Sequence, residues 1–289
     1  MADVQAFFDP ATATITYLVS DPATKRAALI DPVLDFEMKT ARVTTSGIDA
    51  ILAGAAAQGL TIDWSLETHA HADHLSAGDY VRGKTGAKIG IGALITDIQK
   101  TFRPLFNAED VTADGAAFDA LFKDGDTFKI GALDARVLHT PGHTAACVTY
   151  VIGEAAFVGD TVFMPDYGTA RTDFPGGDAR ALYHSIRRIF DLPAGTRIFT
   201  GHDYPPPERT VPAWESSLAA QRANNVHIHD GVGEEEFVTL RRARDKTLSA
   251  PNLILPSLQV NIRAGALPPA EADGRRYLKL PINGLGGAP

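Results

Sequence analysis

Cysteine is nearly absent from this chain of 289 residues, in which Cys147 is the single example. One cysteine excludes an intramolecular disulfide and favours a reducing compartment, so we expect a cytoplasmic protein. The neighbouring residues, "ACVTYV", form an apolar strand pattern. This setting predicts that Cys147 is a small buried side chain and not a nucleophile.

Long apolar runs are lacking as well. The chain has no stretch of about 20 apolar residues, which is the length that a membrane-spanning helix requires. Its first residues, "MADVQAFFDP", have neither the basic start nor the apolar run of a signal peptide. We therefore expect a protein that neither crosses a membrane nor is exported.

Basic clusters are few. The chain has 27 basic and 35 acidic residues and a net charge of -8, which argues against a nucleic-acid partner. The densest basic run is "RRARDK" near residue 244, and it follows "EEEF" in one helical pattern. Acidic residues in the first turn and basic residues in the last suit the helix dipole, so we expect a solvent-exposed helix.

Short strand patterns alternate with helical ones from residue 1 to about residue 204, which predicts a layered α/β fold. Two stretches, 47–60 and 181–192, have the apolar spacing of helices. The expected strands are 14–21, 27–33, 64–69, 88–92, 126–131, 134–140, 147–160 with a hairpin turn at "GE", and 196–203.

The pattern of alternating strands and helices ends after "YPPPERTVP". Two helical patterns follow, at 213–225 and 234–248, and then a tail that prolines interrupt. We therefore divide the chain into a catalytic domain, residues 1–205, and a helical and proline-rich C-terminal extension, residues 206–289. The extension has too many prolines for a compact domain of its own, so we expect it to pack on the main domain.

Three histidines and an aspartate crowd into six positions in "HAHADH": His69, His71, Asp73 and His74. Neutral imidazole and carboxylate are the usual ligands of zinc and of non-haem iron. A chance HxHxDH pattern is rare in a chain of this length. The cluster therefore predicts a metal site, for which other parts of the chain must supply the remaining ligands.

Four expected strands each end at a residue that could bind a metal: His69, His143, Asp160 and His202. Strands hold their loops rigidly, and glycine next to three of these residues allows tight turns. We expect the four strand ends to meet at one point. The glycines are Gly142, Gly159 and Gly201.

The other histidines have simpler interpretations. A lone histidine is more often a packed or surface residue than a ligand. We expect His184, His227 and His229 at the surface and a structural role for His139.

HxHxDH, "TPGHT", "GD" and "GHD", in this order, resemble the metallo-β-lactamase superfamily over residues 1 to about 205. The resemblance implies an αββα sandwich with the metal site at one edge. The stretches "LIDPV", "ETHAHADHLSAG", "RTDF" and "GHDY" resemble the persulfide dioxygenases, also called sulfur dioxygenases. The segments "RANNVHIHDGV" and "LPSLQVNIRAGALP" resemble bacterial members known as β-lactamase-like hydrolases.

This resemblance implies a glutathione-persulfide dioxygenase. One Fe(II) per chain would be held by His69, His143 and Asp160, and glutathione persulfide and O2 would give sulfite and a free thiol. Two imidazoles and one carboxylate leave three metal positions open. It also implies orienting or catalytic roles for a further set of residues: His71, Asp73, His74, His202 and Tyr204.

The resemblance makes Arg171 of "RTDF" and Tyr204 of "GHDY" candidates for holding the substrate. An arginine can bind a carboxylate through two hydrogen bonds, and a tyrosine hydroxyl can donate to sulfur or oxygen. Arg171 could instead pair only with Asp173, and Tyr204 could pack beneath the site. Asp31, at the end of "ALID", is expected to support the site as a second-sphere or structural carboxylate.

Two alternatives remain open. The ligand residues could hold two metals, such as zinc, in a glyoxalase II-like thioester hydrolase: the first through His69, His71, His143 and Asp160, the second through Asp73, His74, His202 and a bridging Asp160. A non-enzymatic metal- or persulfide-binding protein is the other alternative. The resemblance allows a homodimer, although no self-complementary apolar helix face marks an interface.

Overall fold

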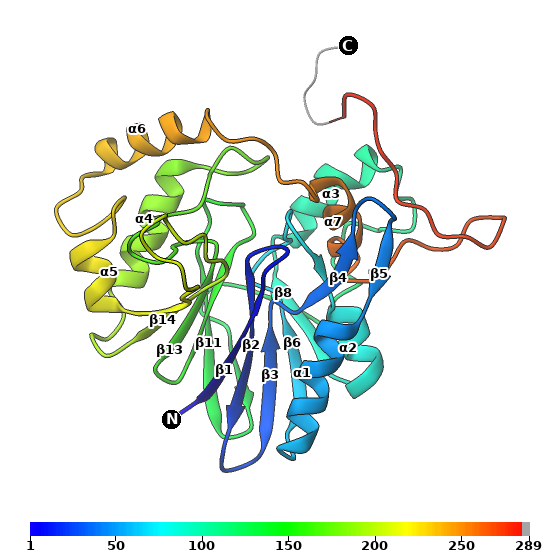
Figure 1. Ribbon diagram of the computed structural model, residues 1–289, viewed down its shortest axis with the longest axis horizontal. Coiled ribbons are helices and arrows are strands. Elements are labelled where there is room, and N and C mark those ends of the chain that lie inside the picture. The colour runs from blue at the N-terminus through cyan, green and yellow to red at the C-terminus, as the bar shows by residue number, and fades with distance from the viewer. Residues whose placement is uncertain (285–289) are drawn as a thin grey trace.

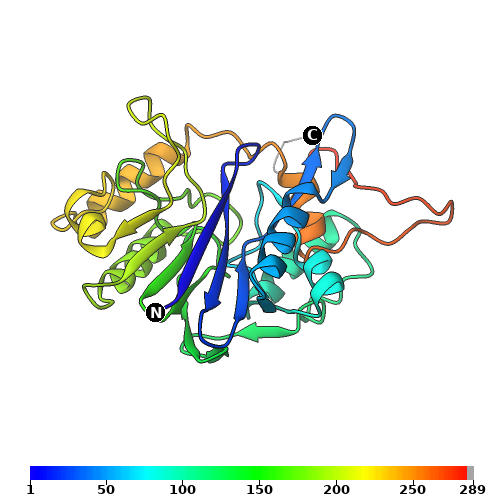
Figure 2. The ribbon, with the colours of Figure 1, turned by 60° about the horizontal axis from the view of Figure 1, so that its bottom comes forward.

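The computed structural model describes residues 1–284 and has four layers (Figure 1). Two six-stranded sheets lie face to face, and helices cover the outer side of each. Figure 2 shows the yellow-green helices on one side of the sheets and the blue-cyan helices on the other. The αββα sandwich expected from the sequence is confirmed. Residues 285–289 of the expected C-terminal extension lie outside the described residues.

The first sheet has the strand order β1-β2-β3-β6-β8-β9. Its first three strands are antiparallel, and the others run parallel to β3. These strands are Asp3–Asp9, Thr14–Asp21, Arg26–Ile30, Thr61–Leu66, Lys88–Gly92 and Ala120–Phe122. A small sheet of order β5-β4-β7 lies next to it, made by Arg42–Thr44, Val33–Glu37 and Leu75–Ser76.

The second sheet has the order β10-β11-β12-β13-β14-β15. Its strands are Thr127–Ile130, Leu133–His139, Val148–Ile152, Ala155–Gly159, Arg197–Thr200 and Glu215–Ser217. The turn at Gly153 and Glu154 joins β12 to β13, as expected. A β-bridge between Thr14 and His202 connects the two sheets at the edge where the candidate ligands lie.

Seven helices are present in residues 1–284: α1 Ser46–Ala57, α2 Gly78–Thr85, α3 Ile95–Leu105, α4 Ala179–Phe190, α5 Leu218–Asn224, α6 Glu234–Asp245 and α7 Ile254–Asn261. Helix α4 illustrates how the sequence fixes these elements. The Asp178 side chain accepts a hydrogen bond from the backbone N–H of Ala181, which caps the helix start. None of the helices described in residues 1–284 is long and apolar enough to cross a membrane.

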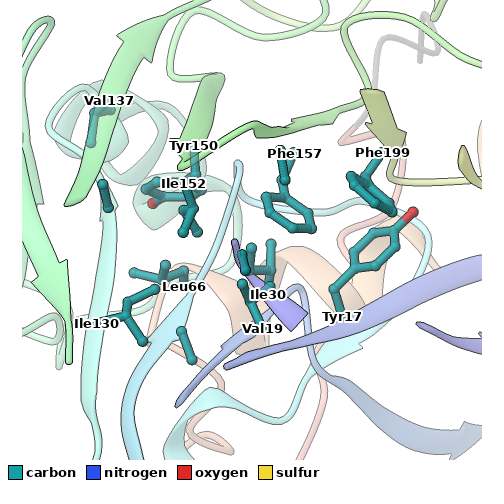
Figure 3. Packing of buried hydrophobic residues seen from close by; sticks show 14 of the residues in the cluster. Tyr17, Val19, Ile30, Leu66, Ile130, Val137, Tyr150, Ile152, Phe157 and Phe199 are labelled. Carbon is teal, nitrogen blue, oxygen red and sulfur yellow. The ribbon is translucent and has the colours of Figure 1, made fainter. Parts of the chain in front are cut away.

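Aliphatic and aromatic side chains together fill the space between the two sheets (Figure 3). The rings of Phe157 and Phe199 stack with centroids 5.0 Å apart, and Tyr17 packs edge-on against both. The buried Tyr17 hydroxyl donates to the backbone oxygen of Thr200 at 2.6 Å. Because this core is closely packed and its polar groups are bonded, the strand ends above it are held in fixed positions.

The C-terminal extension differs from the sequence prediction in three places. Residues 213–225 do not form one helix, because Glu215–Ser217 pairs with β14 as an edge strand and the Ser217 side chain caps α5. Helix α6 is not simply solvated, since Arg241 is fully buried. The tail contains α7, with Pro256 in its first turn where a proline is tolerated. Helix α7 packs against β7 of the main domain. The division of the chain near residue 206 remains a prediction.

Candidate metal centre

The four predicted strand ends meet at one edge of the sandwich. The imidazole rings of His69, after β6, and His143, after β11, lie with centroids 5.0 Å apart. Asp160, after β13, accepts a 2.7 Å hydrogen bond from Nδ1 of His202, after β14. Gly159 makes the turn before Asp160, with φ of +52°, and a Cβ there would lie 2.5 Å from Thr68 Oγ1. The predicted convergence is confirmed.

A hydrogen-bond chain fixes the tautomer of His69. The Thr68 hydroxyl donates its one proton to Asp31 Oδ2 at 2.8 Å, so it must accept from His69 Nδ1 at 3.0 Å. His69 Nε2 is therefore the unprotonated nitrogen, and this buried atom has no hydrogen-bond partner. Burial also lowers the pKa of His69 well below its usual value, which keeps the ring neutral.

His143 is oriented in the same way. Its Nδ1 donates to the backbone oxygen of Arg171 at 2.9 Å, because a carbonyl oxygen can only accept. The Nε2 atom is left facing Asp160, 3.7 Å from Oδ2. Burial lowers the pKa of His143, so this imidazole is also neutral.

His69, His143 and Asp160 each offer one ligand atom, and these atoms lie within 4.8 Å of one another. Burial disfavours the charged form of Asp160, but the neighbouring His202 and other histidines outweigh it and lower the pKa of the carboxyl. Two neutral imidazoles and one ionised carboxylate, with a buried nitrogen left unpaired, fit a divalent transition-metal ion. The site is thus equipped to hold a metal through three side chains.

His71 lies beside this group and faces other partners. Its Nε2 is 3.0 Å from Asp31 Oδ1 and 3.6 Å from Glu67 Oε2. Burial opposes protonation of His71, but Asp31 and Glu67 outweigh it and raise its pKa to about 9. Burial raises the pKa of Glu67 to about 8. His71 therefore falls in two groups of possible ligands, one with Asp31 and Glu67 and one with Asp73 and His74.

His202 lies between two carboxylates. Its Nδ1 contacts Asp160 and its Nε2 donates to Asp73 Oδ2 at 2.5 Å. The dinuclear alternative assigns Asp73, His202 and a bridging Asp160 to its second site, and the structure brings these three side chains together. Asp73 also forms a group with His71 and His74, and the buried Nε2 of His74 has no hydrogen-bond partner.

The family model of the metallo-beta-lactamase superfamily matches residues 10–202, which is more than half of the chain. The chain belongs to the metallo-β-lactamase superfamily. Among solved structures, ETHE1 from Myxococcus xanthus is similar with a TM-score of 0.73 and 30% identity. The similarity covers 91% of this chain and 100% of that one.

Relatives of this superfamily member have different names. The "Beta-lactamase hydrolase-like protein" of Xylella fastidiosa is 54% identical over 99% of this chain, and the chain spans 66% of that protein's length. "Glyoxylase B2" of Dictyostelium discoideum is 45% identical, with 98% of both proteins covered. The human mitochondrial "Persulfide dioxygenase ETHE1" is 32% identical over 92% of this chain and 90% of that protein. The superfamily is therefore established, while the names point to more than one reaction.

A cavity of about 350 Å³ opens beside two of the candidate metal ligands, His143 and Asp160. Tyr204 lies in its wall and stacks on His202, with ring centroids 5.6 Å apart and planes 4° apart. Tyr204 thus reaches the cavity, as the substrate hypothesis requires. The cavity wall also contains three arginines. Arg171 comes from a loop of the main domain, and Arg241 and Arg244 come from α6 of the extension.

Arg171 is already engaged. Its guanidinium donates to both carboxylate oxygens of Asp173, at 2.6 and 2.8 Å, and to the backbone oxygen of Ser249 at 2.6 Å. Arg171 therefore forms the ion pair with Asp173 that the structural alternative expects. Arg244 was not predicted as a site residue, although it lies in the cavity wall with its guanidinium 5.6 Å from the Tyr167 ring. The sequence signal for it was weak, because only the fold brings α6 over this edge.

One histidine prediction is wrong. His227 is buried and not at the surface, because its Nδ1 accepts a 3.0 Å hydrogen bond from the backbone N–H of Thr169. His184 and His229 are exposed, as expected, and His139 bonds the backbone oxygen of Ala145.

Cys147 agrees with its prediction as a core residue. The thiol is buried, and burial raises its pKa to about 12. A thiol in this state carries no thiolate at neutral pH, which fits the absence of a nucleophilic role.

Proposed function

We propose that this protein is a persulfide dioxygenase that uses one Fe(II) per chain to oxidise the terminal sulfur of glutathione persulfide. The observation that carries the proposal is the group His69, His143 and Asp160, two imidazoles and one carboxylate converging from three strand ends. This donor set is the one that non-haem iron oxygenases use. The 32% identity to a protein named persulfide dioxygenase supports the same reaction.

The overall reaction balances with one water. A persulfide RSSH, O2 and H2O give the thiol RSH, sulfite and two protons, so the sulfur–sulfur bond breaks and the outer sulfur is oxidised. Bound Fe(II) would supply open coordination positions and a redox-active centre, while the four electrons that reduce O2 come from the persulfide sulfur. The chain orients the ligands. Nδ1 of His202 donates to Oδ1 of Asp160, which leaves Oδ2 directed toward His143.

The cavity wall supports an anionic substrate. Asp173 neutralises Arg171, and Asp245 neutralises Arg241. Within residues 1–284, Arg244 has no carboxylate partner, so it is the cation available to a glutathione carboxylate at this site. Tyr204, stacked on His202, would place its hydroxyl near the persulfide sulfur.

A glyoxalase II-like hydrolase is the second candidate. The group His71, Asp73 and His74 offers ligands for another metal, and a relative covered over 98% of its length is named Glyoxylase B2. The contacts of His202 with Asp160 and Asp73 bring together residues that this alternative assigns to its second site. A binding protein without catalysis is disfavoured, because a three-ligand site leaves metal positions open. The reducing setting favoured by the single buried cysteine makes the cytoplasm the proposed compartment.

A metal exchange separates the two reactions. The chain is prepared without metal, loaded with Fe(II) or with Zn(II), and the bound metal is measured. Each form then receives glutathione persulfide under oxygen or S-lactoylglutathione without oxygen. We expect oxygen uptake only with Fe(II) and persulfide, since Zn(II) has no redox chemistry. Thioester hydrolysis by either form, together with no oxygen uptake, would overturn the proposal in favour of the hydrolase.

A further inference from the structure

The segment from Thr169 to Thr172 carries the carbonyl that orients His143, and the C-terminal extension holds it at both ends. At one end, the N–H of Thr169 donates to His227 Nδ1 at 3.0 Å, and its carbonyl accepts from Arg241 Nη1 at 2.9 Å. At the other end, the N–H and the hydroxyl of Thr172 both donate to Asp245 Oδ2, at 3.0 and 2.9 Å. The contacts reach from α6 and from the loop before it to the edge of the metal site.

A single peptide unit connects Asp245 with His143. The carbonyl of Arg171 and the N–H of Thr172 belong to the same peptide bond. This unit is planar, and in its trans form the carbonyl and the N–H point in opposite directions. Asp245 therefore accepts from one edge of the peptide, while the opposite edge accepts from His143 Nδ1 at 2.9 Å. Hydrogen bonds in such a chain polarise and strengthen one another.

Asp245 is itself held rigidly. Its Oδ1 accepts a hydrogen bond from Nε of Arg241 at 2.8 Å and lies 2.7 Å from Nη2, so one carboxylate oxygen contacts the arginine and the other contacts Thr172. The side chains of Arg241 and Asp245 are only 1% and 6% exposed. Each oxygen of the buried Asp245 carboxylate has its own partner, so rotating the carboxylate would leave a buried group unpaired. The ion pair therefore has one favourable geometry.

We propose that Asp245 is a positioning residue for the metal ligand His143, acting through the peptide between Arg171 and Thr172. In this arrangement the extension, which lies outside the stretch that the family model matches, fixes the direction of a metal ligand in the main domain. Arg241 fixes Asp245. The inference rests on the proposed metal site but not on the reaction, because metal binding is measured without substrate.

The test compares three variants of the full chain. Asp245→Asn removes the charge from the carboxylate, and Thr172→Val removes the hydroxyl, which is one of the two donors that Thr172 offers to Asp245, and adds no charge. Asp21→Asn is the matched control. Asp21 is a buried carboxylate that also accepts from a threonine hydroxyl and a backbone N–H, those of Thr24 and Ala132. It lies at the opposite end of β2 from Thr14, which contacts His202.

The probe is Co(II), whose visible absorption reports the geometry of its ligands and whose affinity is measured by competition with a chelator. Asp245→Asn is expected to lower the Co(II) affinity about 10- to 100-fold and to change the absorption spectrum, as loss of an outer-sphere partner does. Thr172→Val is expected to do the same to a smaller degree. Asp21→Asn is expected to lower the unfolding temperature and leave affinity and spectrum unchanged.

Wild-type affinity and spectrum in Asp245→Asn would overturn the inference, as would an equal loss of affinity in Asp21→Asn. If Asp245→Asn does not fold, Thr172→Val decides: an unchanged spectrum and affinity overturn the inference, and a changed spectrum with weaker binding supports it. Failure of the wild-type chain to bind Co(II) would remove the metal site itself, and with it both this inference and the proposed function.

Discussion

The side-chain amide of Asn261 donates a hydrogen bond of 2.8 Å to the backbone oxygen of His71. The same amide nitrogen donates to the backbone oxygen of His74 at 2.8 Å, and the amide oxygen accepts from the N–H of Ser76. Asn261 ends α7, so a helix of the extension holds the loop that carries the HxHxDH pattern. One buried side chain thus satisfies three backbone groups of the loop that carries the HxHxDH pattern.

Asn261→Ala is expected to reduce both stability and metal affinity, because it leaves these three backbone groups unpaired. The loss of stability should be about 1 to 3 kcal/mol. Denaturant unfolding and chelator competition measure the two effects. Gln99→Ala is the control, since Gln99 also bridges buried backbone groups, those of Ile262 and Gly115, neither of which belongs to the loop of the histidines. Equal losses of metal affinity in both variants would contradict the role assigned to Asn261.

The stability of the protein is expected to fall as the pH falls from about 6.5 toward 4. Burial lowers the pKa of His227 from 6.5 to about 4, and its neutral Nδ1 accepts from the N–H of Thr169. In this interval the unfolded chain binds the proton more readily than the folded chain. The contribution of His227 is therefore complete above the unfolded pKa and is lost as the pH falls.

His227→Asn tests this assignment, because an asparagine oxygen can accept the same hydrogen bond without titrating. Unfolding free energies of the variant and the wild type are compared across this pH interval. The difference in stability between wild type and variant should change by about 1 to 2 kcal/mol across it. Parallel pH profiles would show that His227 does not cause the loss.

Tyr204→Phe is expected to lower kcat/KM for persulfide oxidation about 10- to 100-fold without loss of metal, which is the effect of removing one hydrogen bond to a charged group. Tyr204 lies in the cavity wall and stacks on His202, but it is not in the three-ligand group. Tyr167→Phe is the control from the same wall. Unchanged kcat/KM in Tyr204→Phe would exclude a role for its hydroxyl.

Arg244→Gln is expected to raise KM for glutathione persulfide about 3- to 5-fold, with little change in kcat, because an exposed ion pair contributes less than about 1 kcal/mol. The effect should weaken at high salt concentration. Arg242→Gln removes a neighbouring exposed arginine of α6 that does not line the cavity and should leave KM unchanged. A KM that is the same in both variants would show that Arg244 does not contact the substrate.

Much of the metal centre could be predicted from the sequence. His69, His143, Asp160 and His202 each follow a short apolar strand pattern, and strands of one sandwich bring such ends to one edge. The tautomers of the two histidine ligands could not be predicted. They depend on Thr68, Asp31 and a backbone carbonyl, whose positions follow from the packing of distant strands.

The extension was harder to predict, because its interactions are not local. Arg241 and Asp245 are four residues apart on α6 and suggest a solvated ion pair, yet both are buried against the segment at Thr169. His227 is buried because Gly168, with φ of +106°, leaves room for the ring: a Cβ there would lie 2.1 Å from Nδ1. Neither contact can be predicted from sequence spacing, because each joins segments about 60 to 70 residues apart in the chain.

The most direct test of the proposed function is the ratio of oxygen consumed to sulfite formed. Anaerobically loaded protein with a measured content of one Fe(II) per chain receives glutathione persulfide in an oxygen electrode, and sulfite and thiol are then determined. A dioxygenase that places both oxygen atoms on one sulfur gives one sulfite and one thiol for each O2. No oxygen uptake by protein that still holds its iron would contradict the proposed function.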